Sequence, residues 1–164
     1  MDMTQSPAPT HDPGPNDLLL VRRMAASPMN IWRCWTEPEL LKQFFAPAPG
    51  KTTEAVIEPV PGGRFYTKMV FEEFGEIGGE GCVLLAEPGR RLVFTDALSQ
   101  GFRPKDEAFF TADILLTPVE GGCEYRVIAR HANAEAAQKH REMGFDSGWG
   151  QVAGQLEAVA ASLG

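Results

Sequence analysis

The sequence lacks the features that would place the chain in a membrane, on nucleic acid or in a disulfide-bonded class of proteins. No hydrophobic run approaches the ~20 residues of a membrane span, so we expect no membrane-spanning segment. Lysine and arginine number 15 against 22 aspartate and glutamate residues, and the net charge is -7. A nucleic-acid binder usually has a basic footprint, so no nucleic-acid partner is expected.

The chain also has few cysteines, and its N-terminus does not resemble a signal peptide. The three cysteines, Cys34, Cys82 and Cys123, are far apart and show no CxxC or other metal-ligand spacing. We therefore expect a reducing compartment, no metal and no cofactor. The N-terminus has neither a positive region nor an apolar region typical of a signal peptide, which predicts a cytoplasmic location.

What is present predicts one globular domain. The 164 residues are 43% hydrophobic and 23% charged, as in an ordinary folded protein. Residues 1–16 are rich in Pro, Ser, Thr, Asp and Gly, so we expect a disordered N-terminal tail there and a single domain over 17–164. Predicted elements are a strand at 18–21, helices beginning at Pro28 and over 39–45, strands at 52–58, 64–74, 81–87, 91–97, 108–118 and 123–131, and a helix over 133–163.

The turn and loop residues between these elements predict antiparallel pairing of the strands. Gly75, Gly78 and Gly79 are interpreted as a turn, and residues 99–106 as a polar loop. Consecutive strands joined by short turns pair in antiparallel orientation. The last helix carries an apolar stripe that must be buried, and the sheet is its only large partner. We therefore predict an α+β fold in which a curved antiparallel sheet wraps a long C-terminal helix, with a cavity where the sheet curls away.

Several short segments, in this order and spacing, resemble a known family. They are Ala25-Ala26-Ser27-Pro28, Thr36-Glu37-Pro38-Glu39-Leu40, Pro61-Gly62-Gly63-Arg64-Phe65, Pro88-Gly89-Arg90-Arg91-Leu92-Val93-Phe94-Thr95-Asp96, Gly121-Gly122 and Gly148-Trp149. Together they resemble the START-like (SRPBCC) superfamily, and within it the bacterial branch of activator of Hsp90 ATPase homologue (AHSA1-like) proteins. Phe44-Phe45 departs from the pattern, because many relatives have Trp there.

The resemblance implies the helix-grip (START-like, Bet v 1-like) fold and a deep, mostly apolar cavity between the long helix and the sheet. Relatives bind lipids, polyketides, hormones and other hydrophobic molecules, and some are cyclases, aromatases or dehydratases. Ordinary core packing is the alternative for each inward residue. The expected ligand-binding residues are Phe65, Thr67, Met69, Phe94, Phe110, Ala112, Tyr125, Val127, Phe145, Trp149 and Val152.

Two polar residues on inward faces are candidates for acid–base chemistry. His131 follows the last strand's inward positions, and its reference pKa suits proton transfer near neutral pH. Asp96 shares a face with Phe94. A hydrogen-bonded strand-end histidine and a loop-capping aspartate are the structural alternatives. His140 gives no metal spacing. Gly148 lets the helix approach a strand, leaves room beside a ligand or contributes to a kink with Gly144.

Three functions from different classes follow. We favour a binding module for a hydrophobic small molecule. An enzyme acting on such a ligand by acid–base chemistry, with His131 and Asp96 as its groups, is the alternative. A co-chaperone of Hsp90 ranks last, because the eukaryotic activator has a separate N-terminal domain and only a short tail is expected here. A homodimer stays open on general grounds, since symmetric dimers are common.

Overall fold

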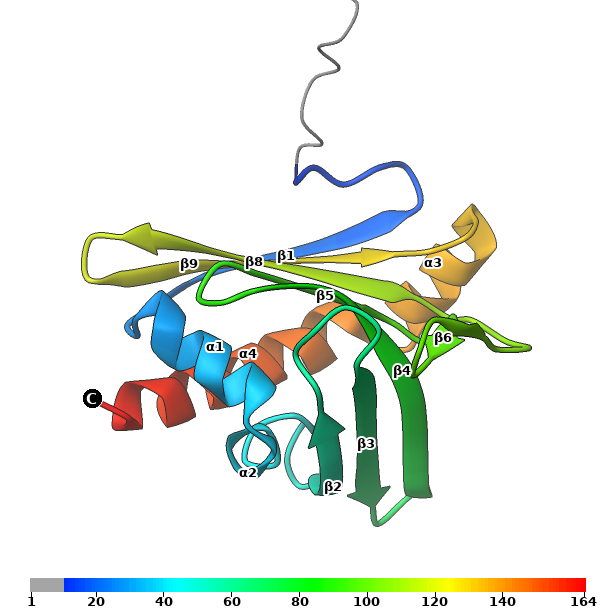
Figure 1. Ribbon diagram of the computed structural model, residues 1–164, viewed down its shortest axis with the longest axis horizontal. Helices are drawn as coiled ribbons and strands as arrows, with labels where there is room; N and C mark the ends of the chain where they lie inside the picture. The colour runs from blue at the N-terminus through cyan, green and yellow to red at the C-terminus, as the bar shows by residue number, and fades with distance from the viewer. Residues whose placement is uncertain (1–10) are drawn as a thin grey trace, which may run out of the picture.

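The computed structural model describes residues 11–164, and its elements follow the expected order (Figure 1). The strands and helices are β1 (Asp17–Met24), α1 (Pro28–Thr36), α2 (Pro38–Leu41), β2 (Lys51–Ile57), β3 (Arg64–Phe71), β4 (Gly75–Glu87), β5 (Arg91–Thr95), β6 (Leu98–Ser99), β7 (Arg103–Pro104), β8 (Thr111–Val119), β9 (Gly122–Arg130), α3 (Ala134–Glu142) and α4 (Phe145–Ser162).

The main sheet has seven antiparallel strands in the order β1-β9-β8-β5-β4-β3-β2. In Figure 1 the first strands of this order lie nearly flat, whereas β4, β3 and β2 turn sharply downward. A register shift between Val83 and Leu85 lies within the long strand β4, and such bulges bend and twist a strand. The sheet therefore curls around α4, which confirms the predicted α+β helix-grip architecture.

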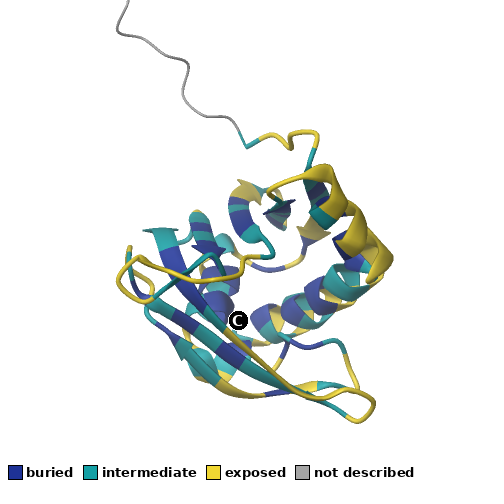
Figure 2. Cartoon of the chain, turned by 90° about the vertical axis from the view of Figure 1, so that its right-hand side faces the viewer, coloured by how far each residue is buried: buried dark blue, intermediate teal, exposed yellow. Residues whose placement is uncertain are grey.

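The helices begin where local chemistry favours them. Ser27 caps α1 by accepting a hydrogen bond from the Asn30 amide at 3.1 Å, and Pro28 occupies the first turn. Gly144 separates α3 from α4 with φ of 91°, a left-handed conformation that favours glycine. The C-terminal helical region is thus two helices that meet at Gly144. The side of α4 that faces the sheet carries its buried residues, Phe145, Val152, Ala153, Leu156 and Ala160 (Figure 2).

Two local predictions were wrong. The glycine-rich segment Gly75–Gly79 is not a turn but the first part of β4, paired with Thr67–Phe71 of β3. The turn lies just before it, at residues 72–74. Glycine is disfavoured in strands, yet hairpin pairing with β3 is enough to hold it there. The polar loop after β5 likewise contains a short strand pair, β6 with β7.

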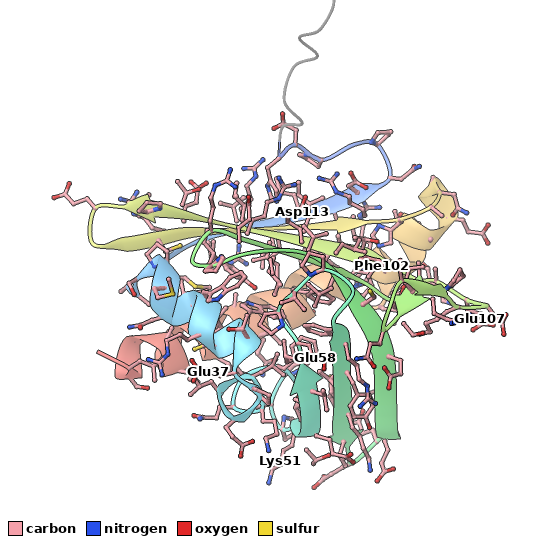
Figure 3. All side chains as sticks on the ribbon, in the orientation of Figure 1. Glu37, Lys51, Glu58, Phe102, Glu107 and Asp113 are labelled. Atoms are coloured by element: carbon pink, nitrogen blue, oxygen red, sulfur yellow. The ribbon has the colours of Figure 1, made fainter. Side chains whose placement is uncertain are left out.

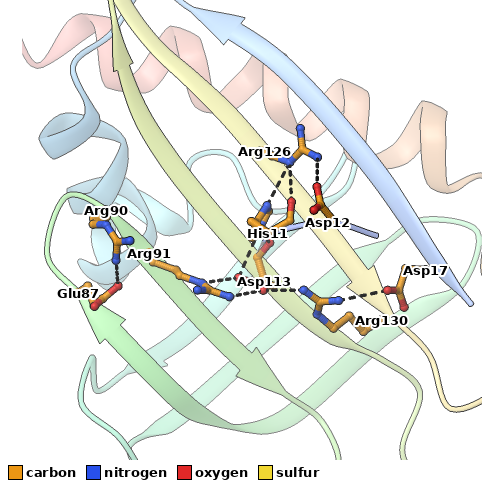
Figure 4. A network of polar contacts seen from close by, with 9 residues as sticks. All are labelled: His11, Asp12, Asp17, Glu87, Arg90, Arg91, Asp113, Arg126 and Arg130. Carbon is orange, nitrogen blue, oxygen red and sulfur yellow. Dashed lines mark hydrogen bonds and ion pairs between the residues drawn. The ribbon is translucent and has the colours of Figure 1, made fainter. Parts of the chain in front are cut away.

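The outer face of the sheet carries a buried charge cluster. Asp113 points away from α4, and it accepts hydrogen bonds from Arg91 at 2.7 and 3.0 Å and from Arg130 at 3.0 Å (Figures 3 and 4). His11 covers it, with Nε2 3.3 Å from a carboxylate oxygen of Asp113, while Arg126 donates to His11 Nδ1 at 3.1 Å. Residues 1–10 of the expected tail lie outside the described residues; the described part, 11–16, runs along this face.

Candidate functional site

A cavity of about 450 Å³ lies between the curled part of the sheet and the start of α4. Its walls come from strands β3, β4 and β5, from the segment before β8, from the α3–α4 junction and from the segment after α2. Most of the lining is aromatic or aliphatic. The aromatic residues in it are Phe45, Phe65, Phe71, Phe94, Phe109, Phe110, Phe145 and Trp149.

Glycines create part of this space. Gly148 lies on α4 beside the cavity, and a Cβ atom added to it would meet nothing within 4 Å. Gly79 lies on β4, where an added Cβ would meet only the hydroxyl of Thr67 at 4.0 Å. Gly148 therefore leaves room at the cavity and does not serve a close approach of the helix to a strand. Of the functional explanations raised by the sequence for Gly148, the geometry favours room beside a ligand.

The back wall is held by stacked aromatic rings. Phe65 and Phe94 lie 3.8 Å apart between ring centroids at an interplanar angle of 6°. Trp35 packs behind both of them, at 6.5 Å from Phe65 and 5.8 Å from Phe94. Trp149 of α4 stacks on the same indole at 6.4 Å. Buried rings with several aromatic neighbours have few alternative rotamers, so this wall is already formed without a ligand.

The structure places most of the expected binding residues along this cavity. Eight line it: Phe65, Thr67, Met69, Phe94, Phe110, Phe145, Trp149 and Val152. The other three, Ala112, Tyr125 and Val127, are completely buried and do not line it. They also face inward, but they belong to β8 and β9, where α1 and α4 cover the sheet. Contact of any of these residues with a ligand stays a prediction.

His131 and Asp96 are each bonded elsewhere, and no hydrogen bond joins them within residues 11–164. The Asp96 carboxylate accepts from the backbone amides of Phe109 at 2.8 Å and Phe110 at 3.2 Å, which is the loop-capping arrangement. His131 lies just after β9. Its Nδ1 is 2.9 Å from the carbonyl oxygen of Asn16, and its Nε2 is 2.9 Å from Nδ1 of His140.

His140 of α3 is the site residue that sequence reasoning missed. Its side chain is buried and lines the cavity. Three aromatic rings surround it, with centroids at 4.8 Å for Phe109, 5.0 Å for Phe110 and 5.1 Å for Phe145. Burial, and then the neighbouring His131, lower the pKa of His140 to about 4. The imidazole is therefore neutral at pH 7, as expected for a group held among apolar rings.

Other polar groups at the cavity are few, and its carboxylates are already paired. Glu80 of β4 accepts from Arg64 Nε at 3.1 Å, and the two side chains form an ion pair. The described part of the chain contains no group of three or more His, Cys, Asp or Glu side chains positioned to hold a metal ion. The one polar side chain in the lining that combines burial, a neutral ring and a defined partner is His140.

A seven-stranded curved sheet, a long C-terminal helix across its concave face and an apolar cavity between them define a START-like helix-grip protein. The family model for Activator of Hsp90 ATPase homolog 1-like proteins matches residues 25–161, and the chain belongs to this family. This confirms the resemblance seen in the sequence. None of the helices in residues 11–164 is both long and apolar enough to span a bilayer.

Solved structures of bacterial proteins are similar throughout. A protein from Nitrosomonas europaea is 38% identical, with a TM-score of 0.84 over 87% of this chain and 92% of its own. A protein from Rhodobacter sphaeroides is 28% identical, with a TM-score of 0.79 over 93% and 98%. An AHSA1-like protein from Aeromonas hydrophila shares the fold at 15% identity, with a TM-score of 0.69 over 90% and 93%. No curated protein matches the sequence.

Proposed function

We propose that the protein binds a hydrophobic small molecule in the cavity between the sheet and α4. The observation that carries the proposal is the cavity itself, about 450 Å³ with an aromatic lining. Ligand sites are typically apolar hollows of ~300–1,000 Å³ with a few polar groups.

The size of the cavity limits the ligand. An apolar cavity of about 150 Å³ is enough to bind benzene. The cavity here is about three times larger, which suits two or three fused rings or an aliphatic chain of similar volume. The mostly aromatic lining favours a ligand with aromatic rings, because ring–ring contacts add to simple burial.

The rim of the cavity offers a route for entry. Met143, at the α3–α4 junction, is 67% exposed, and Ile77 of β4 is 43% exposed; both line the cavity. Large apolar side chains gathered at an opening are typical of ligand entrances. Methionine is also unbranched and flexible, so Met143 can move aside without disturbing the wall.

Thermal unfolding against a panel of fatty acids, aromatic polyketides, flavonoids and sterols tests the proposal. A ligand at ~100 times its dissociation constant adds about 2.7 kcal/mol to the free energy of unfolding. For a domain of this size that raises Tm by roughly 5–10 °C. The matched control is a Gly148→Leu variant, in which the leucine side chain occupies the cavity. No compound should raise the Tm of this variant. A panel that shifts both proteins equally, or neither, would contradict cavity binding of these classes.

The histidine pair gives a second candidate function, catalysis on the bound molecule. A neutral imidazole beside an apolar pocket has the protonation state that a general base requires. Incubation of each panel hit with the protein, followed by mass spectrometry of the mixture, tests it. Product formation that depends on His140 would favour an enzyme. Quantitative recovery of unchanged ligand would favour a binding module.

A further inference from the structure

The hydrogen bonds of His131 determine where its proton lies. Nδ1 of His131 is 2.9 Å from the carbonyl oxygen of Asn16, and a carbonyl oxygen only accepts hydrogen bonds. Nδ1 must therefore carry the proton. In the neutral ring the other nitrogen, Nε2, then has a lone pair and can only accept.

The same reasoning gives the position of the proton on His140. Its Nδ1 lies 2.9 Å from Nε2 of His131, so it must donate to that lone pair when both rings are neutral. The remaining nitrogen of His140, Nε2, then has a lone pair as well. No protein group within residues 11–164 forms a hydrogen bond to this nitrogen, and His140 lines the cavity. The chain Asn16–His131–His140 thus ends in an acceptor at the ligand site.

The groups around His140 preserve its neutral state, with the proton on Nδ1 and the lone pair on Nε2. Phe109, Phe110 and Phe145 face the ring from the segment before β8 and from α4, and none of them can donate a strong hydrogen bond. The carboxylates in the same lining are engaged, Asp96 by two backbone amides and Glu80 by a guanidinium. Of the titratable groups in residues 11–164, only His131 contacts the imidazole directly.

We propose that the His131–His140 pair makes the cavity selective for a hydrophobic ligand that carries a hydroxyl group, such as a phenol or an alcohol. The hydroxyl proton is donated to Nε2 of His140 while the rest of the molecule lies among the aromatic rings. An ether of the same shape leaves the acceptor unpaired, and a carboxylate presents a negative charge to a lone pair. His131 is the positioning residue, because it holds His140 in the required tautomer. This inference rests on the proposed function and specifies its ligand class.

Three probes with one ring system test the selectivity: 2-naphthol, 2-methoxynaphthalene and 2-naphthoate. Fluorescence titration at pH 7 should give an affinity for 2-naphthol about tenfold higher than for the ether, and weaker binding still for the carboxylate. His140→Phe should bind the ether as before and lose the preference for 2-naphthol. His131→Phe should reduce the preference, because the tautomer is no longer fixed. His11→Gln, a histidine change on the opposite face of the sheet, should leave it unchanged.

The outcomes separate the two proposals. Equal affinity of the native protein for 2-naphthol and 2-methoxynaphthalene would overturn the hydroxyl selectivity while supporting a hydrophobic site. Binding of none of the three probes would count against both. Nitrogen-15 NMR of the imidazoles gives a readout that needs no variant. Both His131 and His140 should be protonated at Nδ1 and not at Nε2, and an Nε2-protonated His140 would refute the inference.

Discussion

Filling the cavity from Gly148 is the most direct perturbation of the proposed site. The residue lies in α4, lines the cavity and has open space where a side chain would start. Gly148→Ala adds one methyl group at the edge of that space, and Gly148→Leu projects a branched side chain into it. Gly154 lies on the same helix, is exposed and also has open space around its Cβ position, so it provides the matched control.

The expected stability changes can be worked out separately for the helix and the cavity. Replacing glycine by alanine within a helix stabilises it by about 1 kcal/mol, which raises Tm by roughly 2–4 °C in a domain of this size. Both Gly148→Ala and Gly154→Ala should show this gain. Gly148→Leu should gain as much or more, because burial of a leucine side chain contributes up to about 3 kcal/mol when complete. Most single substitutions destabilise a protein, so a stabilising one at the cavity is a distinctive result.

Ligand affinity provides the second measurement. Gly148→Leu should weaken binding of 2-methoxynaphthalene by more than about tenfold, since the leucine and the naphthalene ring compete for one volume. Gly154→Leu should bind it as the native protein does. The reasoning fails if Gly148→Leu keeps native affinity, or if Gly148→Ala lowers Tm, because the space beside α4 would then not be the ligand space.

Three further outcomes are expected. Asp113→Asn should lower stability by about 2 kcal/mol, measured by urea unfolding; this is less than for a fully buried pair because Arg91 is partly exposed. Burial alone would raise the pKa of Asp113, but hydrogen bonds from its partners hold that pKa well below the usual range for a carboxyl group. The stability of the native protein should therefore fall as the pH drops below about 3.9, the pKa of Asp in the unfolded chain, and the Asp113→Asn variant should lose stability less steeply over the same range. All three cysteines are buried, and burial raises the pKa of Cys34 and Cys123 to about 11, so iodoacetamide at pH 8 should label them only after unfolding, as mass spectrometry would detect.

Much of the fold was predictable because alternation and helix capping are local signals. The period-two pattern of Phe65, Thr67 and Met69 places these side chains on one face, and all three line the cavity. The start of β4 was not predictable in the same way. Three of the five residues in Gly75–Gly79 are glycines, which give no side chain from which to infer alternation, and the conformation of the segment depends on pairing with β3.

The site was only partly predictable because it depends on how separate elements meet. His131 and His140 are nine residues apart, and a chain reversal between β9 and α3 brings their rings together. No fixed sequence spacing encodes such a contact, so a search for metal-ligand patterns passes over it. Two histidines on either side of a short strand–helix connection would have been a usable signal. Tyr125 shows the opposite difficulty, since an inward position is a core position wherever a helix covers the sheet.

The carbonyl oxygen of Asn16 lies just before the first strand of the fold, yet it acts on the histidine pair. A shortened protein starting at Asp17 would keep every strand and helix of the fold. It would nevertheless lose the oxygen atom that orients the proton of His131. Both imidazoles would then be free to exchange tautomers, and His140 could offer a proton to the cavity instead of accepting one. If the proposed hydroxyl selectivity holds, trimming the chain to its regular secondary structure, a routine step before crystallisation, would abolish that selectivity while leaving the fold intact.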